Sequence, residues 1–266
     1  MINIVIAGAA GRMGQALIRC ARRFDKIRII GAVERPGHSD LDKDAGSVAG
    51  IDSINVRLND SLPDALKNAD VLIDFTLHST VQENANIAVG MRRAMVIGTT
   101  GLMPNETEVI NLAASKIPIV WAPNMSLGVN LLFSVLKKAG SIFSDGYVIE
   151  IDETHHVHKK DSPSGTALRL GEKIAEGLGQ ELNRLMLHDA ENPDMAAVPG
   201  KIVIRSHREG EAIGDHAVTF TNESERIEFT HKAFSRDAFA MGALRAAQWV
   251  VTQRPGLYDM QNVLSL

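Results

Sequence analysis

The chain has 266 residues, of which 45% are apolar and 23% are charged, with a formal net charge of −4 and one cysteine. The length accommodates one large or two ordinary domains, and the composition is typical of a globular protein. The acidic balance argues against a nucleic-acid partner, because nucleic-acid-binding domains usually carry a strong excess of basic residues. A single cysteine excludes an intrachain disulfide and CxxC-type metal or redox sites.

The sequence also argues against a membrane partner. It contains no run of about 18 apolar residues, the minimum for a membrane-spanning helix. The apolar run at the N-terminus has no preceding basic residue, and Arg12 and the glycines interrupt it too early for the core of a signal peptide. Because a chain without disulfides also fits a reducing compartment, we expect a cytoplasmic protein.

Up to about residue 125, short apolar runs alternate with helical patterns. Strands that alternate with helices predict βαβ units, and continuous apolar runs are typical of parallel strands covered on both faces. We therefore expect an α/β fold with an N-terminal Rossmann-type domain around a parallel sheet. The predicted strands are residues 2–7, 27–33, 71–75, 96–97 and 117–122, and the predicted helices are a first one with apolar positions from Met13 to Phe24, then 79–93 and 104–115.

After about residue 125 the pattern changes. Short neighbouring strands joined by polar turns predict a second domain of α+β type with a mostly antiparallel sheet. The predicted helices are residues 127–143, 163–178 and 237–251, and the predicted strands are 147–154, 201–207, 216–221 and 226–231. We expect the last helix to return to the first domain, which gives one domain of residues 1–126 with 237–266 and a second of residues 127–236.

A glycine-rich turn follows the first predicted strand and opens the first predicted helix. Gly8, Gly11 and Gly14 form a GxxGxxG variant of the dinucleotide-binding turn, in which backbone N–H groups approach a pyrophosphate at a helix N-terminus. Glu34 ends the second strand about 20 residues later, where an acid contacts a ribose 2′-hydroxyl. This pattern predicts nucleotide binding; the alternative is a tight strand–helix connection without a ligand.

Two further features bear on the cofactor. Arg35 follows Glu34 and is either a partner for the 2′-phosphate of NADP or an exposed arginine at a strand end. The GTTG stretch at residues 98–101 follows the fourth strand, at the edge of the sheet where ligands of open parallel sheets bind.

The stretch THHVHKKDSPSGTA, residues 154–167, contains three of the nine histidines. It could be a metal site, a solvated basic loop or a catalytic site that handles an anion. A zinc site is disfavoured because His155, His156 and His158 lack the i, i+4 helical spacing and no cysteine accompanies them. The sequence favours the anion-handling site, and we expect no metal.

Strand geometry and helix capping suggest how that site is arranged. If the strand continues past residue 154, His155 and Lys159 share one face. Asp161 or Ser162 would then cap the next helix, with Pro163 in its first turn.

The first-turn N–H groups of Ser164, Gly165 and Thr166 would attract an anion, and a histidine beside them can carry a proton near neutral pH. A second basic cluster, His231, Lys232 and Arg236, is either a further anion contact or an ordinary strand end.

The sequence resembles the 4-hydroxy-tetrahydrodipicolinate reductase (dihydrodipicolinate reductase) family nearly end to end. The matching motifs are VIAGAAGRMG, the Glu34–Arg35 pair, DFT, VIGTTG, APNMSLGVN, EIDETHHVHKKDSPSGTA, REGEAIGDH and FTHKAFSR. The resemblance implies hydride transfer from NADH or NADPH to a cyclic, unsaturated imine dicarboxylate with loss of water, in the diaminopimelate route to lysine.

The resemblance also implies roles for particular residues. His155 would be the proton donor and acceptor, Lys159 the second catalytic group and His156 a substrate contact, while Gly165 and Thr166 would hold a substrate carboxylate. It further implies a homotetramer built through the sheet of the second domain. The cofactor contacts that it implies are Gly8, Ala9, Ala10, Gly11, Arg12, Met13, Glu34, Arg35, Gly98, Thr99, Thr100, Ala122, Pro123, Asn124 and Met125.

Two other functions compete with this one. A semialdehyde dehydrogenase would need a cysteine nucleophile in the second domain, whereas Cys20 lies in the first predicted helix. A cofactor-sensing protein without turnover would bind NADH or NADPH but would not consume it.

Overall fold

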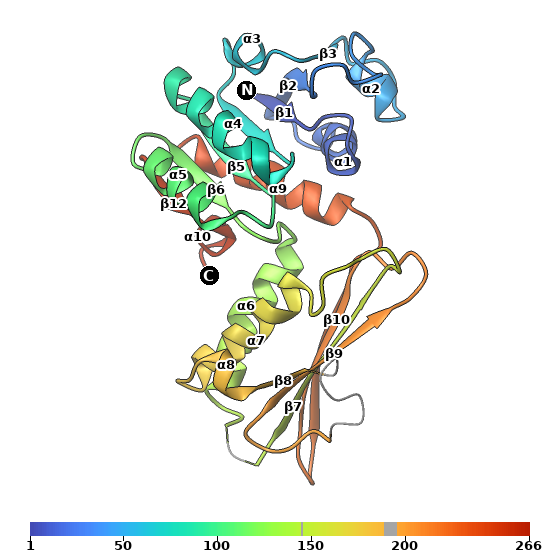
Figure 1. The fold of residues 1–266 in the computed structure, drawn as a ribbon, viewed down its shortest axis with the longest axis vertical. Coiled ribbons are helices and arrows are strands. Elements are labelled where there is room, and N and C mark those ends of the chain that lie inside the picture. The colour runs from blue at the N-terminus through green and yellow to red at the C-terminus, as the bar shows by residue number, and fades with distance from the viewer. Residues whose placement is uncertain (145, 189–195) are drawn as a thin grey trace. The chain divides into compact units, whose positions relative to one another are not determined.

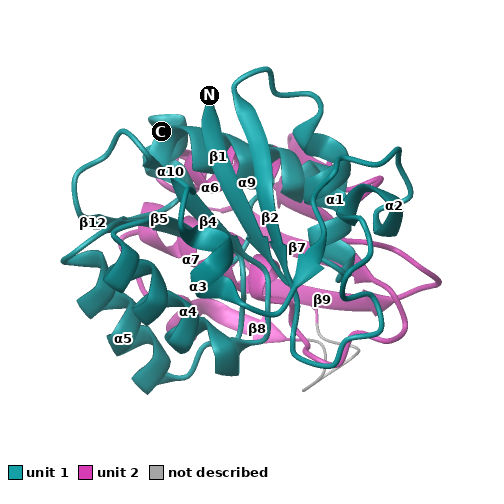
Figure 2. Ribbon diagram, turned by 90° about the horizontal axis from the view of Figure 1, so that it is seen from above, with its two compact units in different colours: residues 1–127, 236–265 teal, residues 128–235, 266 magenta. Residues whose placement is uncertain are grey.

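The computed structural model describes residues 1–144, 146–188 and 196–266. The chain forms two compact units, residues 1–127 with 236–265 (unit 1) and residues 128–235 with Leu266 (unit 2), coloured separately in Figure 2. Among the described residues, none of the helices combines the length and the hydropathy needed to span a bilayer.

Unit 1 is built on a seven-stranded sheet in which every pair of neighbours is parallel. The strand order is β12-β6-β5-β4-β1-β2-β3, so the order reverses between β1 and β4, and the predicted Rossmann-type domain is confirmed. The strands are β1 (Ile2–Ala7), β2 (Ile27–Val33), β3 (Leu58–Asn59), β4 (Val71–Asp74), β5 (Ala94–Ile97), β6 (Pro118–Trp121) and β12 (Gly256–Tyr258).

Two helical layers cover this sheet because successive strand residues point to opposite faces. In β1, Ile4 and Ile6 belong to one buried cluster, and Val5 and Ala7 belong to the other. The first cluster includes α1 (Arg12–Ala21), α2 (Ala45–Val48), α9 (Asp237–Val250) and α10 (Met260–Leu264). The second includes α3 (Leu62–Leu66), α4 (His78–Met91) and α5 (Pro104–Ala114).

The C-terminal helix α9 returns to unit 1, as the sequence predicted. A Cβ atom at Gly242 of this helix would overlap the carbonyl group of Met125. The absence of a side chain therefore lets α9 approach the segment that follows β6, and the helix fills the layer beside α1 (Figure 1).

Unit 2 contains a five-stranded sheet in the order β11-β10-β7-β9-β8 (Figure 1). Its elements are α6 (Leu127–Gly140), β7 (Val148–His155), α7 (Gly165–Gly177), α8 (Leu182–Leu185), β8 (Met186–His188), β9 (Ile202–Arg208), β10 (Asp215–Thr221) and β11 (Arg226–Lys232). The pairs β11–β10 and β10–β7 are antiparallel, whereas β7–β9 and β9–β8 are parallel. The sheet is mixed because the connection that leaves β7 passes through α7 and α8, and a helical crossover permits parallel pairing.

The two faces of this sheet differ. Ile149 and Ile151 of β7 pack with α6 and α7 in a buried cluster, and Glu153 and His155 continue the same face. The opposite face of the sheet carries charged and hydroxyl side chains, among them Glu150, Asp152, Arg205, Thr219 and Thr221.

The short elements β3, α2, α3, α8, β8, β12 and α10 were not predicted. None is longer than five residues, and periodicity needs a longer window to be recognised. They owe their conformation to the neighbouring strands and helices against which they pack.

Candidate active site

The glycine-rich turn connects β1 to α1 at the point where the strand order reverses. Gly8 has φ +76°, and a Cβ atom there would lie 2.7 Å from the carbonyl oxygen of Phe75. A Cβ atom at Gly14 would lie 2.6 Å from Cα of Ala9 and closer still to the Gly8 carbonyl oxygen. Glycine is therefore required at both positions for the turn to pack between strand ends and helix.

Glu34 at the end of β2 contacts this turn directly. Its Oε2 accepts a hydrogen bond of 3.2 Å from the backbone N–H of Ala10, and its Oε1 accepts one of 3.0 Å from the N–H of Arg35. The carboxylate is thus held beside the turn, where a ribose would lie next to a bound pyrophosphate. Arg35 is exposed, a position that suits either of the two roles expected for it.

The residues after β5 and β6 are brought to the same edge of the sheet. A Cβ atom at Gly98 would collide with the ring of Phe75, so the close approach requires glycine. The buried Thr99 donates its hydroxyl proton to Asp74 Oδ1 at 3.2 Å, and Asp74 also accepts from Thr76. The Thr99 side chain therefore stabilises the strand ends, whereas Thr100 is exposed.

The segment from Ala122 to Met125 follows β6. Ala122 and Met125 are 2% and 1% exposed, and both belong to the core of unit 1. Asn124 Oδ1 accepts a hydrogen bond of 2.8 Å from the N–H of Ser126, and Pro123 is exposed. Contacts of this segment with a cofactor would therefore come mainly from its backbone and from Pro123.

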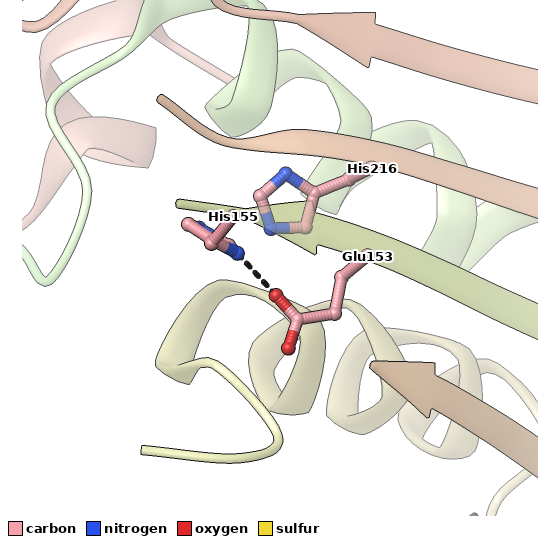
Figure 3. Close-up of side chains that lie close together, drawn as sticks. All are labelled: Glu153, His155 and His216. Carbon is pink, nitrogen blue, oxygen red and sulfur yellow. Dashed lines mark ion pairs between the residues drawn. The ribbon is translucent and has the colours of Figure 1, made fainter. Parts of the chain in front are cut away.

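A second group of functional side chains lies in unit 2. His155 is the last residue of β7 and is 8% exposed, and its Nδ1 forms an ion pair with Oε2 of the fully buried Glu153 (Figure 3). His216 of β10 lies opposite Glu153 in the strand register. The rings of His155 and His216 meet edge to face, with centroids 5.2 Å apart.

The N-terminus of α7 is joined to this group. Ser164 is the N-cap, and its side chain accepts a hydrogen bond of 3.2 Å from the N–H of Ala167. Its own N–H donates to Glu153 Oε1 at 3.1 Å, and its Oγ lies 3.4 Å from His216 Nε2. A Cβ atom at Gly165 would meet no atom within 4 Å, so Gly165 faces open space at the start of α7.

Two details of the predicted arrangement are wrong. The strand ends at His155 and a loop follows, so strand parity does not place Lys159. The cap of α7 is Ser164 instead of Asp161 or Ser162, and Pro163 precedes the helix, because this loop occupies residues 156–163 before the helix begins.

Lys159 and His156 take their positions from that loop. The backbone N–H of Lys159 donates a hydrogen bond of 3.1 Å to the carbonyl of His156. The Nζ of Lys159 forms an ion pair with Asp161 at 2.8 Å. The N–H of His156 donates to the carbonyl of Ala212 at 2.8 Å. The Lys159 charge is the smallest of the contributions that lower the pKa of His216.

Glu153 and His216 both neighbour His155, but only Glu153 is charged at neutral pH. Burial alone would raise the pKa of Glu153, but the hydrogen bond and charge of His155, with Ser206 and Arg208, outweigh burial and lower it to about 2. Burial, and next the charge of a protonated His155, lower the pKa of His216 to about 3. At neutral pH Glu153 is therefore ionised and His216 is neutral.

Sequence reasoning missed Glu153, Arg208 and His216 as members of this site. Glu153 had a usable signal, because it lies two residues before His155 on a strand and therefore on the same face. Arg208 and His216 are the first and last residues of the family motif REGEAIGDH, but only the pairing of β9 and β10 with β7 shows that they join this site.

The same cluster bears on the metal prediction. Glu153, His155 and His216 offer ligand atoms within 4.8 Å of one another. However, the Arg208 guanidinium lies 3.2 Å from Glu153 Oε1, and its positive charge opposes a divalent cation there. The donor set therefore fits an ion pair better than a metal ion, and the expectation of no metal stays a prediction.

Comparison with known proteins places the chain in a family. The model of the dihydrodipicolinate reductase N-terminus matches residues 2–125, and the model of its C-terminus matches residues 128–264. This chain belongs to the dihydrodipicolinate reductase family. The membership confirms the predicted family and makes the protein a reductase that uses NADH or NADPH.

Individual relatives agree with this assignment. The 4-hydroxy-tetrahydrodipicolinate reductases of Syntrophotalea carbinolica and Geobacter sulfurreducens are each 44% identical over 266 residues and cover the full length of both chains. The dipicolinate-bound dihydrodipicolinate reductase of Paenisporosarcina sp. TG-14 is 25% identical, with a TM-score of 0.78 over 98% of this chain and 99% of that one.

The structure also argues against the semialdehyde dehydrogenase. Cys20 is fully buried in α1 of unit 1. Burial, and next the charge of Asp237, raise the pKa of its thiol to about 11. A thiol of this kind is not a nucleophile at neutral pH, because the thiolate is the reactive form.

Proposed function

We propose that this reductase converts 4-hydroxy-tetrahydrodipicolinate to tetrahydrodipicolinate with loss of water, in the diaminopimelate pathway of lysine biosynthesis. The observation that carries the proposal is the buried Glu153–His155 pair beside the N-terminus of α7, in a chain of this family. In this proposal unit 1 binds the dinucleotide and unit 2 binds the substrate.

Unit 1 offers the features that a nicotinamide dinucleotide needs. The backbone N–H groups of Arg12 and Met13, in the first turn of α1, would hold the pyrophosphate, because those of Gly8 to Gly11 already donate to Val33, Glu34 and Gly8. Glu34 would accept hydrogen bonds from the adenosine ribose. The exposed Arg35 could pair with a 2′-phosphate, so we expect the protein to use both NADH and NADPH. A bound cofactor supplies the hydride.

Unit 2 offers the features that a dicarboxylate needs. The first turn of α7 at Gly165 and Thr166 would receive one carboxylate, since a helix N-terminus favours an anion. Ser164 would position this turn, because its own N–H donates to Glu153. Lys159 would contribute a cation, with His156 as a further contact. The relative from Paenisporosarcina binds dipicolinate, a dicarboxylate of the same class, which supports this assignment.

His155 and Lys159 would then perform the proton chemistry. Hydride addition to one end of the conjugated C=C–C=N system of the dehydrated substrate leaves an electron pair that a proton must quench. His155 first takes a proton from water on Nε2 and becomes an imidazolium, then donates that proton to the substrate and returns to the neutral ring, which keeps charge and atoms in balance. The Lys159 cation opposes the negative charge that develops in the transition state.

A coupled assay tests this function. The protein should oxidise NADH or NADPH only when the cyclic substrate is present. Replacement of His155 by Gln should lower kcat by at least ~10²-fold while the fold is retained. His158→Gln serves as the control and should leave kcat within about twofold, because His158 has no role in the proposal.

Near-normal turnover of a folded His155→Gln variant would contradict the role of His155. If wild type binds NADH but does not turn it over, the proposed reductase activity is contradicted and a cofactor-sensing function is favoured.

We also propose that the protein is a cytoplasmic homotetramer assembled through the sheet face of unit 2 that the helices leave uncovered. The hydroxyl oxygens of Thr219 and Thr221 are buried and make no hydrogen bond within the described part of the chain. A facing copy of the sheet would supply partners for such groups.

Light scattering should give four times the 28.8 kDa mass of the chain. Thr219→Arg should reduce that mass, because an unpaired charge at the centre of an interface is costly. A monomeric wild type would refute the assembly.

A further inference from the structure

We propose that Glu153 is the positioning residue of His155: it keeps hydrogen on Nδ1, so that Nε2 is the atom that exchanges a proton with the substrate. The inference rests on the proposed function, in which His155 is the proton carrier. It goes beyond that function because it assigns the tautomer, the reacting nitrogen and the side chain that selects both.

The first evidence is the ion pair itself. Oε2 of Glu153 forms an ion pair with Nδ1 of His155, and the two residues are 0% and 8% exposed (Figure 3). A neutral imidazole carries one N–H, and a carboxylate can only accept. With water kept away from this carboxylate, the N–H must be on Nδ1, which leaves Nε2 as the nitrogen that takes up a proton from water and then passes it to the substrate.

The second evidence is that the carboxylate cannot turn away. Its other oxygen, Oε1, accepts hydrogen bonds from the Ser164 N–H at 3.1 Å and from both terminal nitrogens of Arg208 at 3.2 Å. Arg208 also donates to the carbonyl of Asp161 at 2.6 Å, in the loop that carries Lys159. The Glu153 carboxylate therefore links the His155 imidazole to the N-terminus of α7 directly and to the loop that carries Lys159 through Arg208.

The third evidence concerns the Nε2 side of the ring. A Cβ atom at Gly214 would lie 3.1 Å from His155 Nε2, at a residue with φ +155°. Glycine at this position keeps that side of Nε2 clear of a side chain. The neighbouring ring of His216 is neutral at neutral pH and does not compete for the Glu153 carboxylate.

Glu153→Gln in the full-length protein tests the inference. The amide oxygen of Gln can still accept from Ser164 and Arg208, which directs the amide NH₂ group toward His155 Nδ1. Nδ1 must then accept, and the hydrogen moves to Nε2. We expect kcat to fall by about 10²-fold with an unchanged KM for NADH, since a Gln amide that donates to Nδ1 cannot stabilise the imidazolium from which Nε2 donates, whereas cofactor binding does not involve this pair.

Glu172→Gln provides a matched control, because it makes the same chemical change on the exposed surface of α7, where Glu172 pairs only with Arg169 among the described residues. Its kcat should remain within about twofold of wild type. A folded Glu153→Gln variant that does the same would overturn the inference.

A second readout needs no turnover. Nitrogen-15 NMR of histidine-labelled protein distinguishes the tautomers, and the His155 signals are those lost in His155→Gln. In the neutral form of the ring, wild type should show hydrogen on Nδ1, and Glu153→Gln should show it on Nε2. Hydrogen on Nε2 alone in wild type would overturn the inference even if the variant does not fold. Absent wild-type turnover would count only against the proposed function.

Discussion

The glycine-rich turn of unit 1 and the histidine cluster of unit 2 are built in different ways. The turn is made by one continuous segment, and what matters in it is the absence of side chains at Gly8 and Gly14. The cluster is made by side chains from β7, β9, β10 and the start of α7, joined through one buried carboxylate. The glycine-rich turn thus tolerates little added side-chain volume. The histidine cluster depends instead on the charge states of the residues around His155.

The strongest test of this contrast is volume added to the turn. Gly14→Ala should destabilise unit 1 by about 1–3 kcal/mol, the usual cost of overpacking, because the new methyl group would overlap Gly8 and Ala9. Urea unfolding followed by tryptophan fluorescence measures this, since Trp121 and Trp249 both lie in unit 1.

Gly90→Ala is the matched control for that experiment. Gly90 lies within α4, and an added Cβ atom would meet nothing within 4 Å. The substitution should be neutral or should stabilise by about 0.5–1 kcal/mol, because Ala favours a helix interior. Equal destabilisation by the two substitutions would contradict the crowding argument.

The second test addresses charge in unit 2. His216 has a folded-state pKa near 3, so an unfolded chain binds more protons than the native one below about pH 6.5. Stability should therefore fall by about 2–3 kcal/mol between pH 6.5 and 4.5. The contribution of Glu153, whose pKa is lowered to about 2, is still present in that window and is lost only at lower pH.

Denaturant unfolding followed by circular dichroism at several pH values measures the effect. His216→Gln removes the titrating group and should flatten the profile over this window. A variant profile as steep as that of wild type would show that other groups cause the acid sensitivity.

A third test concerns the charge of Arg35 in unit 1 and its effect on cofactor selection. Arg35→Gln should raise the KM for NADPH about tenfold and leave that for NADH unchanged, because only NADPH carries the 2′-phosphate. In wild type the two KM values should lie within about tenfold. A preference beyond about 100-fold, or equal effects of the variant on both cofactors, would remove Arg35 from cofactor selection.

The smallest effect is expected at Cys20. Its buried thiol, with a pKa raised to about 11, should not react with a thiol reagent at pH 8 in the folded protein and should react fully after denaturation. Counting reacted thiols before and after denaturation measures this. Rapid reaction in the folded state, accompanied by loss of activity, would reopen a catalytic role for the cysteine.

The sequence was most informative where neighbouring residues act together. The strands at Ile2–Ala7 and Ile27–Val33 and the helix at Asp237–Val250 were recognisable because apolar periodicity is a local property. The turn at Gly8–Gly14 and the acid at Glu34 were found for the same reason. Lys159 was misplaced because strand parity holds only inside a strand, and β7 ends at His155.

By itself, the sequence determined the α/β class, the nucleotide-binding turn, the family motifs and the identity of His155 as a proton carrier candidate, since each depends on residues close together in the chain. Only the tertiary structure decided that Glu153 pairs with His155, that Arg208 and His216 join them, and that Ser164 caps α7. Those contacts depend on strand register and on burial. Both are properties of the whole fold, and burial is what shifts the pKa of a histidine such as His216.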